Sequence, residues 1–300
     1  MIKDVIVVEC DLGGPHSGAA LGCRALLAEL GDKVNVVDSI NVAALPVRQS
    51  KLKKAHYLGE INECIDRLSS SIFHFYQNND SQLKVIAGDH STASGSLAGL
   101  KKAFPDKRIG VVWIDAHADI HSPYTTPSGN VHGMPVAAAA CKDHLHRARN
   151  ELDEQTVELW NNTKALCGES IALKDLVYVG IRDLEQEEWD IVKEENIKYF
   201  QVADLNEQGS KRIAHQCLEY LDDCDLLYVS FDIDSLDAKL VPGTGTPVGD
   251  GLSVEQAQEL LSVLFSSEKL KMFEVVEINP LLDNKNETAK RVASTLIGAF

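Results

Sequence analysis

Residues 109–119 read IGVVWIDAHAD, an apolar run followed at once by two carboxylates and an imidazole. The run predicts a buried strand over Ile109–Ile114. In extended backbone, side chains at i, i+2 and i+4 point the same way, so Asp115, His117 and Asp119 should converge beyond the carboxyl end of that strand. Burying such a group is costly without a counter-charge, and a divalent cation supplies one.

Acidic or imidazole side chains also follow two other predicted strands. Asp232 and Asp234 follow the strand-like run Leu226–Val229, and His90 follows Leu83–Ala87. Each piece alone has an ordinary structural explanation, such as a helix cap or a hydrogen-bonded loop, but the three together indicate a metal site. Carboxylate-rich sites of this kind suit Mn²⁺, with Mg²⁺, Fe²⁺, Co²⁺ and Zn²⁺ also open. The six candidate ligands are His90, Asp115, His117, Asp119, Asp232 and Asp234.

Short apolar runs alternate with helical patterns along the whole chain, which predicts an α/β fold. The predicted strands are Val5–Val8, Val34–Val37, Leu83–Ala87, Ile109–Ile114, Leu176–Ile181, Ile197–Phe200, Leu226–Phe231 and Met272–Ile278. The predicted helices are Ala19–Leu30, Ala55–Gln77, Ser94–Phe104, Gln186–Glu195, Lys211–Leu221, Val254–Phe265 and Glu287–Phe300. Because the strands are apolar on both faces, the sheet should be parallel and covered by helices.

Loops are expected over Asp119–Val131, Val241–Leu252 and the polar stretch Leu145–Ser170. The first two follow ligand clusters, and sites in open α/β sheets lie at the carboxyl ends of strands. No linker rich in proline, glycine and serine divides the chain, so a single domain over residues 1–300 is expected.

The composition excludes several classes of partner and location. A net charge of −16 argues against nucleic acid as a partner and weakly favours a cationic small molecule. No apolar run is long enough to predict a membrane span, and no secretion signal opens the sequence. The seven cysteines lack Cys-x-x-Cys spacing, which suggests reduced thiols and a cytoplasmic location.

Four sequence motifs resemble those of the arginase family of ureohydrolases. They are AGDHS (87–91), DAHADIHSPYTTPSGNVHGMP (115–135), SFDIDSLDAKLVPGTGTPVGDGLS (230–253) and EINP (277–280). The resemblance implies a three-layer α/β/α sandwich with a central, mostly parallel eight-stranded sheet. It also implies two Mn²⁺ per chain, hydrolysis of L-arginine to L-ornithine and urea, and a homo-oligomer, either trimer or hexamer.

The resemblance also implies how the ligands are shared. One ion would be held by His90, Asp115, Asp119 and Asp232, and the other by Asp115, His117, Asp232 and Asp234. Asp115 and Asp232 would therefore bridge the two ions.

Five further residues take implied roles around the substrate. Ser128 and Asn130 would contact the α-carboxylate, and His132 would be the proton shuttle. Glu277 would hold the guanidinium group, and Thr246 lies in a turn near that end of the site.

Three positions depart from the family pattern. Ala87 replaces a usual glycine, which should be tolerated unless its φ is positive. His121 stands where an asparagine usually assists recognition of the α-carboxylate, and Glu185 stands where an aspartate usually contacts the α-amino group. These two changes concern substrate selection and leave the predicted metal chemistry intact.

Three other functions stay open. Another ureohydrolase, such as an agmatinase or a guanidino-acid hydrolase, is one; Ser128 and Asn130 argue against agmatinase, because agmatine has no carboxylate. A zinc amide hydrolase of the deacetylase type would leave the second metal's ligands unexplained. A non-catalytic metal- or arginine-binding protein would be favoured by loss of a ligand, His132 or Glu277, and none is lost.

Overall fold

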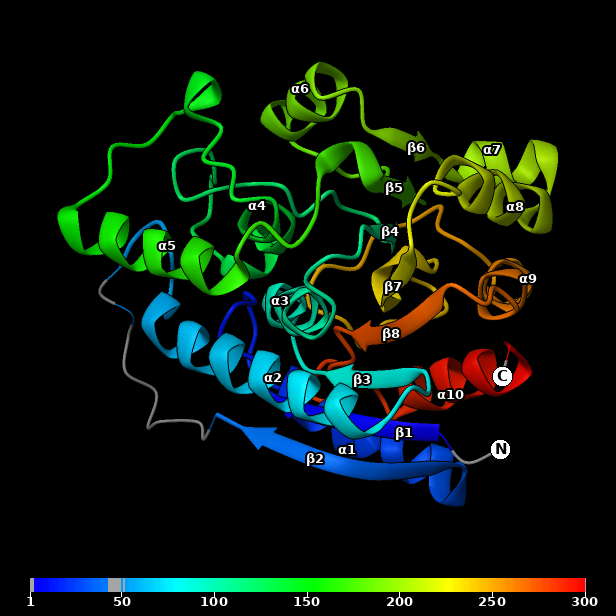
Figure 1. Ribbon diagram of the computed structural model, residues 1–300. Coiled ribbons are helices and arrows are strands. Elements are labelled where there is room, and N and C mark those ends of the chain that lie inside the picture. The colour runs from blue at the N-terminus through cyan, green and yellow to red at the C-terminus, as the bar shows by residue number, and fades with distance from the viewer. Residues whose placement is uncertain (1–2, 43–49, 51, 300) are drawn as a thin grey trace.

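The computed structural model describes residues 3–42, 50 and 52–299, and its strands form one sheet of eight (Figure 1). All neighbouring strands are parallel, in the order β2-β1-β3-β8-β7-β4-β5-β6. Their bounds are β1 Lys3–Glu9, β2 Val34–Asn41, β3 Leu83–Ala87, β4 Ile109–Ile114, β5 Leu176–Val179, β6 Lys198–Phe200, β7 Leu226–Asp232 and β8 Leu270–Val276. The sequence-based prediction of an α/β fold with an eight-stranded sheet is confirmed.

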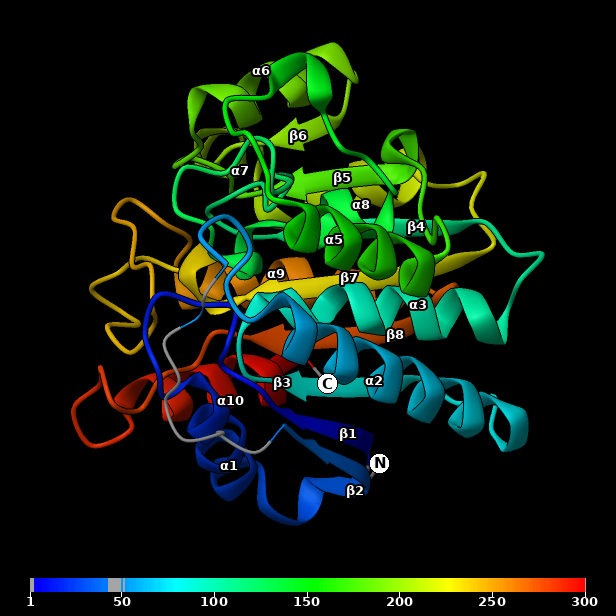
Figure 2. The ribbon, with the colours of Figure 1, turned by 90° about the vertical axis from the view of Figure 1, so that its left-hand side faces the viewer.

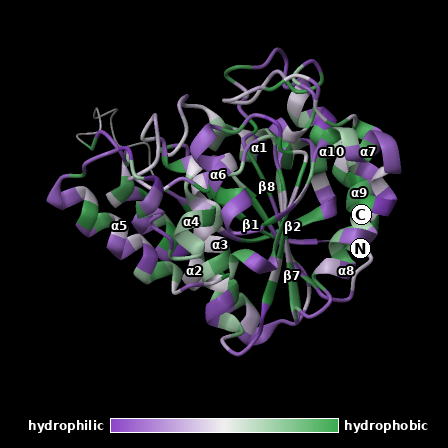
Figure 3. Cartoon of the chain, turned by 90° about the horizontal axis from the view of Figure 1, so that it is seen from above, coloured by the Kyte–Doolittle hydropathy of each residue, from purple (hydrophilic) through white to green (hydrophobic). Residues whose placement is uncertain are grey.

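Helices cover both faces of this sheet, and Figure 3 shows the largely apolar strands between the two helical layers. One layer holds α1 (Ala19–Leu30), α7 (Val202–Gln208), α8 (Ser210–Tyr220), α9 (Val254–Phe265) and α10 (Glu287–Ala299). The other holds α2 (Leu58–Asn78), α3 (Ala93–Ala103), α4 (Pro135–Ala139) and α6 (Gln186–Glu194). A further helix, α5 (Glu154–Cys167), packs outside α2, α3 and α4.

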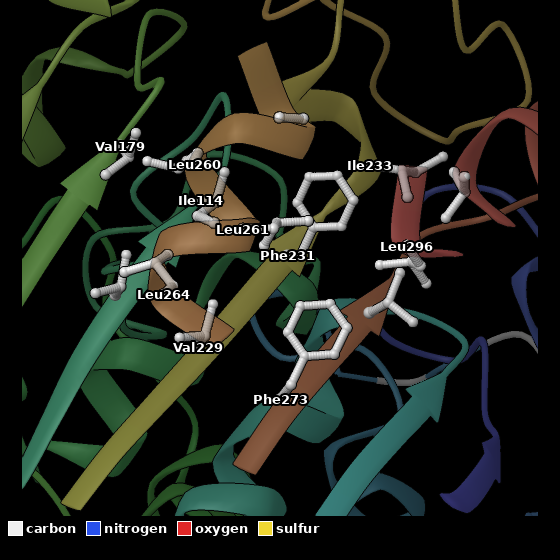
Figure 4. Close-up of a cluster of buried hydrophobic side chains, with 14 of the residues drawn as sticks. Ile114, Val179, Val229, Phe231, Ile233, Leu260, Leu261, Leu264, Phe273 and Leu296 are labelled. Carbon is white, nitrogen blue, oxygen red and sulfur yellow. The ribbon is translucent and has the colours of Figure 1, made fainter. Parts of the chain in front are cut away.

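The alternation of side chains along β7 explains how two cores form on one sheet. Val229 and Phe231 enter the core beneath α9 and α10, where Phe231 packs near Phe273 of β8 (Figure 4). Tyr228 enters the opposite core, beneath α2 and α3. Fully burying an aromatic or aliphatic side chain of this size contributes about 1.5–3 kcal/mol, so both faces stabilise the strand.

All eight predicted strands are present, β3 and β4 with the predicted bounds and the others with shifted ends, but one loop prediction was wrong. Within the predicted loop Leu145–Ser170 the structure has α5. The helix has clear terminal signals, because the Asp153 side chain accepts a hydrogen bond from Thr156 N and Gly168 ends it with a φ of 61°. β8 ends two residues earlier than predicted, because Glu277 has a φ of 69° that no strand continues through.

The strand order brings the predicted site together. β3, β8, β7 and β4 are consecutive in the sheet, so their carboxyl ends lie side by side. Figure 2 shows the arrowheads of these strands pointing to one edge, where the long loops gather. No helix in the described part of the chain combines the length and apolarity that crossing a membrane requires.

Candidate metal centre

His90 lies at the middle of the first ligand group. It begins the short helix η2 (His90–Thr92) directly after β3 and is fully buried. Its Nδ1 lies 3.1 Å from Asp115 Oδ2, 3.0 Å from Asp119 Oδ2 and 3.1 Å from Asp232 Oδ2. Nδ1 nevertheless makes no hydrogen bond. One nitrogen and three carboxylate oxygens thus surround a single point, which is the arrangement that a cation requires.

A second ligand group lies beside the first and shares Asp115 with it. His117 Nδ1 lies 3.1 Å from Asp234 Oδ2 and 3.4 Å from Asp115 Oδ1. Asp115 therefore presents one carboxylate oxygen to His90 and the other to His117. Asp232 presents Oδ2 to the first group, while its Oδ1 accepts a hydrogen bond of 2.8 Å from Asp234 N. All six predicted ligands are brought together.

The electrostatics of the cluster also favour a bound cation. Burial, together with the neighbouring Asp234 and Asp115, raises the pKa of Asp232 well above its usual value. Burial and Asp115 raise the pKa of Asp119 to about 6. Each carboxylate therefore disfavours the ionised form of its neighbours. Because the donors are oxygen and nitrogen without thiolate, the group fits Mn²⁺ or Mg²⁺ better than a structural zinc.

Close backbone approaches hold these ligands in position. A Cβ on Gly88 would lie 1.8 Å from Cys10 O, so only glycine fits between β1 and the end of β3. The neighbouring Asp89 accepts hydrogen bonds of 2.9 Å from Gly13 N and from Ser91 N, which ties two loops together. Among the described residues, Ala87 is not one of those with positive φ, so its replacement of glycine is accommodated.

A cavity of about 450 Å³ opens above the metal ligands. Six carboxylates and three imidazoles line it, and no described lysine or arginine does. Its wall includes six of the predicted substrate and catalytic residues: His121, Ser128, Asn130, His132, Glu185 and Thr246. Ser128 is exposed at the mouth, and Thr246 donates a hydrogen bond of 3.0 Å to Asp234 Oδ2.

Glu277 does not line the cavity but lies directly behind His132. Its Oε1 is 3.1 Å from His132 Nδ1 and accepts a hydrogen bond of 2.9 Å from His90 N. Burial alone would lower the pKa of His132, but the Glu277 carboxylate outweighs burial and raises this pKa to about 9. His132 is therefore held as an imidazolium with Nδ1 fixed.

The two departures from the family pattern, His121 and Glu185, contact each other. His121 Nε2 lies 3.3 Å from Glu185 Oε2 and 3.8 Å from Glu188 Oε2, and Nδ1 is 2.9 Å from Thr125 Oγ1. The hydrogen bond with His121 lowers the pKa of the Glu185 carboxyl well below its usual value. The pair thus forms one polar wall of the cavity.

Two other lining carboxylates escaped the sequence analysis. Glu188, which is buried, accepts a hydrogen bond of 3.2 Å from Glu185 N and so helps to cap α6. The spacing Glu185-x-x-Glu188 was the available signal for it. Asp183 lies 3.7 Å from His117 Nε2, on the outer side of that ligand.

The guanidinium group of Arg182 helps to hold the long loop after β7 in place. Arg182, which follows β5, donates five hydrogen bonds to backbone carbonyl oxygens. The acceptors are Gly249 (3.0 Å, from Nε), Gly180 (3.1 Å, from Nη1), and Asp234 (2.8 Å), Leu236 (3.3 Å) and Val248 (3.0 Å), all from Nη2. This loop carries Thr246, Pro247 and Val248 to the cavity wall.

Comparisons with known proteins agree with this site. The model of the arginase family matches residues 4–300. The arginase of Staphylococcus aureus strain MRSA252 is 33% identical over 99% of this chain and 96% of its own length. That of Bacillus subtilis strain 168 is 31% identical over 95% and 93%. The structure of Entamoeba histolytica arginase in complex with L-ornithine superposes with a TM-score of 0.86 at 29% identity, over 100% of this chain and 99% of the other. This chain belongs to the arginase family.

Proposed function

We propose that this protein hydrolyses the guanidinium group of L-arginine to give L-ornithine and urea, with two Mn²⁺ ions per chain. The observation that carries the proposal is the set of six nitrogen and oxygen ligands, five of them buried and His117 half-buried, beneath an acidic cavity. His90, Asp115, Asp119 and Asp232 would hold one ion, and Asp115, His117, Asp232 and Asp234 the other. Two bound divalent ions would supply a water that loses a proton near neutral pH.

The protein's own residues handle the substrate's charge and the proton. The acidic lining attracts a guanidinium cation to the cavity. His132 carries a proton at neutral pH and faces the cavity, while Glu277 fixes its other nitrogen. When the bond between the guanidinium carbon and the alkyl nitrogen breaks, the leaving amine needs a proton, and His132 is placed to give it. The contact between Glu277 and the guanidinium group, which the family resemblance implies, remains a proposal, because Glu277 lies behind His132 and outside the cavity lining.

The outer part of the cavity suits an α-amino acid. Ser128 and Asn130 offer hydroxyl and amide donors for a carboxylate. Glu185, whose pKa is lowered chiefly by its hydrogen bond with His121, offers negative charge for an ammonium group. His121 also lines the cavity and hydrogen-bonds to Glu185. This combination favours L-arginine over agmatine, which would leave the carboxylate donors without a partner.

The proposal is tested by urea release from L-arginine, agmatine and 4-guanidinobutyrate by the Mn²⁺-loaded protein. We expect L-arginine to have the highest kcat/KM, and chelation of metal to abolish turnover. A preference for agmatine would overturn the arginine assignment and leave the metal chemistry standing. Absence of urea from all three substrates, with two ions bound, would overturn the hydrolytic function.

Three further expectations remain proposals. We propose a single catalytic domain, because one continuous sheet takes its strands from Lys3 to Val276. A cytoplasmic location is supported by seven free cysteines, six of them buried. A homo-oligomer, trimer or hexamer, is expected from the family resemblance, and light scattering after gel filtration tests it.

A further inference from the structure

A short segment before α2 contacts the loop that carries two of the proposed substrate-binding residues. This carboxylate loop (residues 126–130) brings Ser128 and Asn130 to the cavity wall. The supporting segment (residues 53–56) lies behind the loop, and none of its residues lines the cavity. A Cβ on Gly129, whose φ is 85°, would lie only 2.4 Å from Lys53 O. The backbone of the supporting segment therefore rests directly against the turn at Gly129.

Three successive carbonyl groups of the carboxylate loop accept hydrogen bonds from the supporting segment. Lys54 Nζ donates to Pro127 O at 3.3 Å, and His56 N donates to Gly129 O at 2.9 Å. Between them, His56 Nε2 lies 3.2 Å from Ser128 O. Because a carbonyl oxygen can only accept, this ring nitrogen carries the proton and donates it. Two residues of the supporting segment thus hold three consecutive peptide groups of the loop.

These hydrogen bonds determine which groups the carboxylate loop presents to the cavity. The carbonyl oxygens of residues 127–129 face the supporting segment, which is outside the cavity lining, so their partial negative charges do not face a bound anion. Ser128 Oγ accepts a hydrogen bond of 3.1 Å from Asn130 N. No described residue accepts the Ser128 hydroxyl proton, so this proton is available to a carboxylate in the cavity.

The cavity lining itself offers a carboxylate little positive charge. Six carboxylates line the cavity, and no described lysine or arginine does, so an α-carboxylate that enters it meets mostly negative side chains. The half-buried Lys54 carries its positive charge on the other side of the loop, where water and salt screen it from the cavity. Recognition of a carboxylate therefore depends on how accurately the loop places its hydrogen-bond donors.

We propose that Lys54 and His56 are positioning residues that hold the carboxylate loop in the form that recognises the α-carboxylate of the substrate. They favour L-arginine over guanidino compounds without a carboxylate, and they do so without lining the cavity. The inference deepens the proposed function and rests on it. It assigns substrate selection to side chains behind the wall of the cavity as well as to those that form the wall.

Other contacts hold the start of the carboxylate loop without the two side chains. Asn150 Nδ2 donates a hydrogen bond of 2.7 Å to Thr126 O, and Gly129 N donates one of 3.0 Å to Thr126 Oγ1. The bond from His56 N to Gly129 O is a backbone contact that a change of side chain leaves in place. Loss of the Lys54 and His56 side chains should therefore leave the protein folded and release only the peptide groups at 127 and 128.

Three proteins are compared with wild type. The donor-loss variant Lys54→Met, His56→Phe keeps similar side-chain volumes but removes both side-chain donors. The donor-kept variant Lys54→Arg, His56→Gln offers an N–H at each position. Lys53→Met is the matched control, because it removes the same charge one residue earlier, and the Lys53 side chain makes no hydrogen bond or ion pair within the described residues.

For each Mn²⁺-loaded protein, kcat and KM are measured with L-arginine, and the inhibition constant is measured with agmatine as a competitor. We expect the donor-loss variant to raise KM for L-arginine about 3–10-fold at unchanged kcat, as loss of ordinary hydrogen bonds that act on binding alone would do. The inhibition constant of agmatine should not change, because agmatine has no carboxylate. The donor-kept variant and Lys53→Met should both behave as wild type does.

Four results would overturn the proposal. They are a wild-type KM in the folded donor-loss variant, an equal rise in the inhibition constant of agmatine, an equal rise of KM in Lys53→Met, and a donor-kept variant no better than the donor-loss variant. Should the donor-loss variant not fold, Lys54→Met and His56→Phe are measured singly by the same criteria. Wild-type protein that releases no urea from L-arginine would instead overturn the proposed function, and this inference with it.

Discussion

Replacing Gly88 by alanine should displace a metal ligand through the backbone alone. An added Cβ would lie 1.8 Å from Cys10 O, which is about 1.6 Å short of ordinary van der Waals contact. The obstacle is the backbone of Cys10, directly after β1, so no side chain can rotate away to make room. Gly88 N and Asp89 N are also hydrogen-bonded to Val8 O and Cys10 O, at 3.0 and 2.9 Å. The displacement must therefore pass into the following residues, Asp89 and His90.

The expected size follows from that displacement. Misplacing a catalytic group by about 1 Å costs roughly 100-fold in rate, and overpacking a tight site costs about 1–3 kcal/mol in stability. We expect Gly88→Ala to lose at least one ion on dialysis and to release urea from L-arginine at least about 100-fold more slowly. Atomic absorption measures the bound metal, and a urea assay measures the rate of turnover. Unfolding in urea measures the loss of stability.

Gly59→Ala is the matched control for the same chemical change. Its Cβ would lie 3.9 Å from Leu159 Cδ2, which is ordinary contact, and Gly59 is in α2. Alanine in a helix is favoured over glycine by about 0.5–1 kcal/mol, so this variant should be as active as wild type and no less stable. If Gly88→Ala keeps two ions and the turnover of Gly59→Ala, the close approach of β1 and β3 does not position His90.

Three other changes test the remaining assignments. Asp232→Ala should abolish turnover and loosen both ions, and retention of two ions after dialysis would rule out a bridging role. His132→Asn should keep metal and fold but slow turnover roughly 10²–10⁴-fold, partly restored by imidazole; unchanged turnover would remove His132 from the mechanism. Because the folded-state pKa of His132 is raised from 6.5 to about 9, its pairing with Glu277 stabilises the metal-free protein fully below about pH 6.5 and is lost as pH rises through 9. Urea unfolding at several pH values should show that decline in wild type and not in His132→Asn. The double variant His121→Asn, Glu185→Asp should lower KM for L-arginine, and an unchanged or higher KM would contradict the roles given to the two residues.

Local patterns were sufficient to predict which side chains gather at the candidate metal centre. Ile109–Ile114 was predicted with its observed bounds, because a β-branched run buried on both faces has few other interpretations. The ligands follow strands directly, so strand geometry determined where they point. Glu277 illustrates the opposite case. The apolar run continues through Ile278, and the positive φ that ends β8 depends on the hydrogen bond from Glu277 N to Gly88 O at 2.7 Å, a contact across the sheet.

Contacts between distant segments escaped prediction for the same reason. His121 and Glu185 were assigned to different parts of a substrate, yet they hydrogen-bond to each other across 64 residues of sequence. By contrast, α5 was predicted as a loop although Asp153 and Gly168 mark its ends. The polar composition of the segment favours a loop, whereas its capping residues favour a helix.

The hydrogen bonds from Arg182 to the loop after β7 bear on how the substrate preference of this enzyme can change. All five of its hydrogen bonds end on main-chain oxygens, so the anchor is indifferent to which side chains the loop carries. Residues such as Thr246 and Val248 can be exchanged while the loop keeps its path, provided that its length and its glycines are kept. Random libraries confined to positions 246–248, which leave Thr244 and Gly245 unchanged, should therefore yield a high share of folded, metal-loaded proteins with altered substrate preference. Libraries that also vary Arg182 should mostly give proteins in which the loop no longer forms the cavity wall, so that no new substrate preference can be measured.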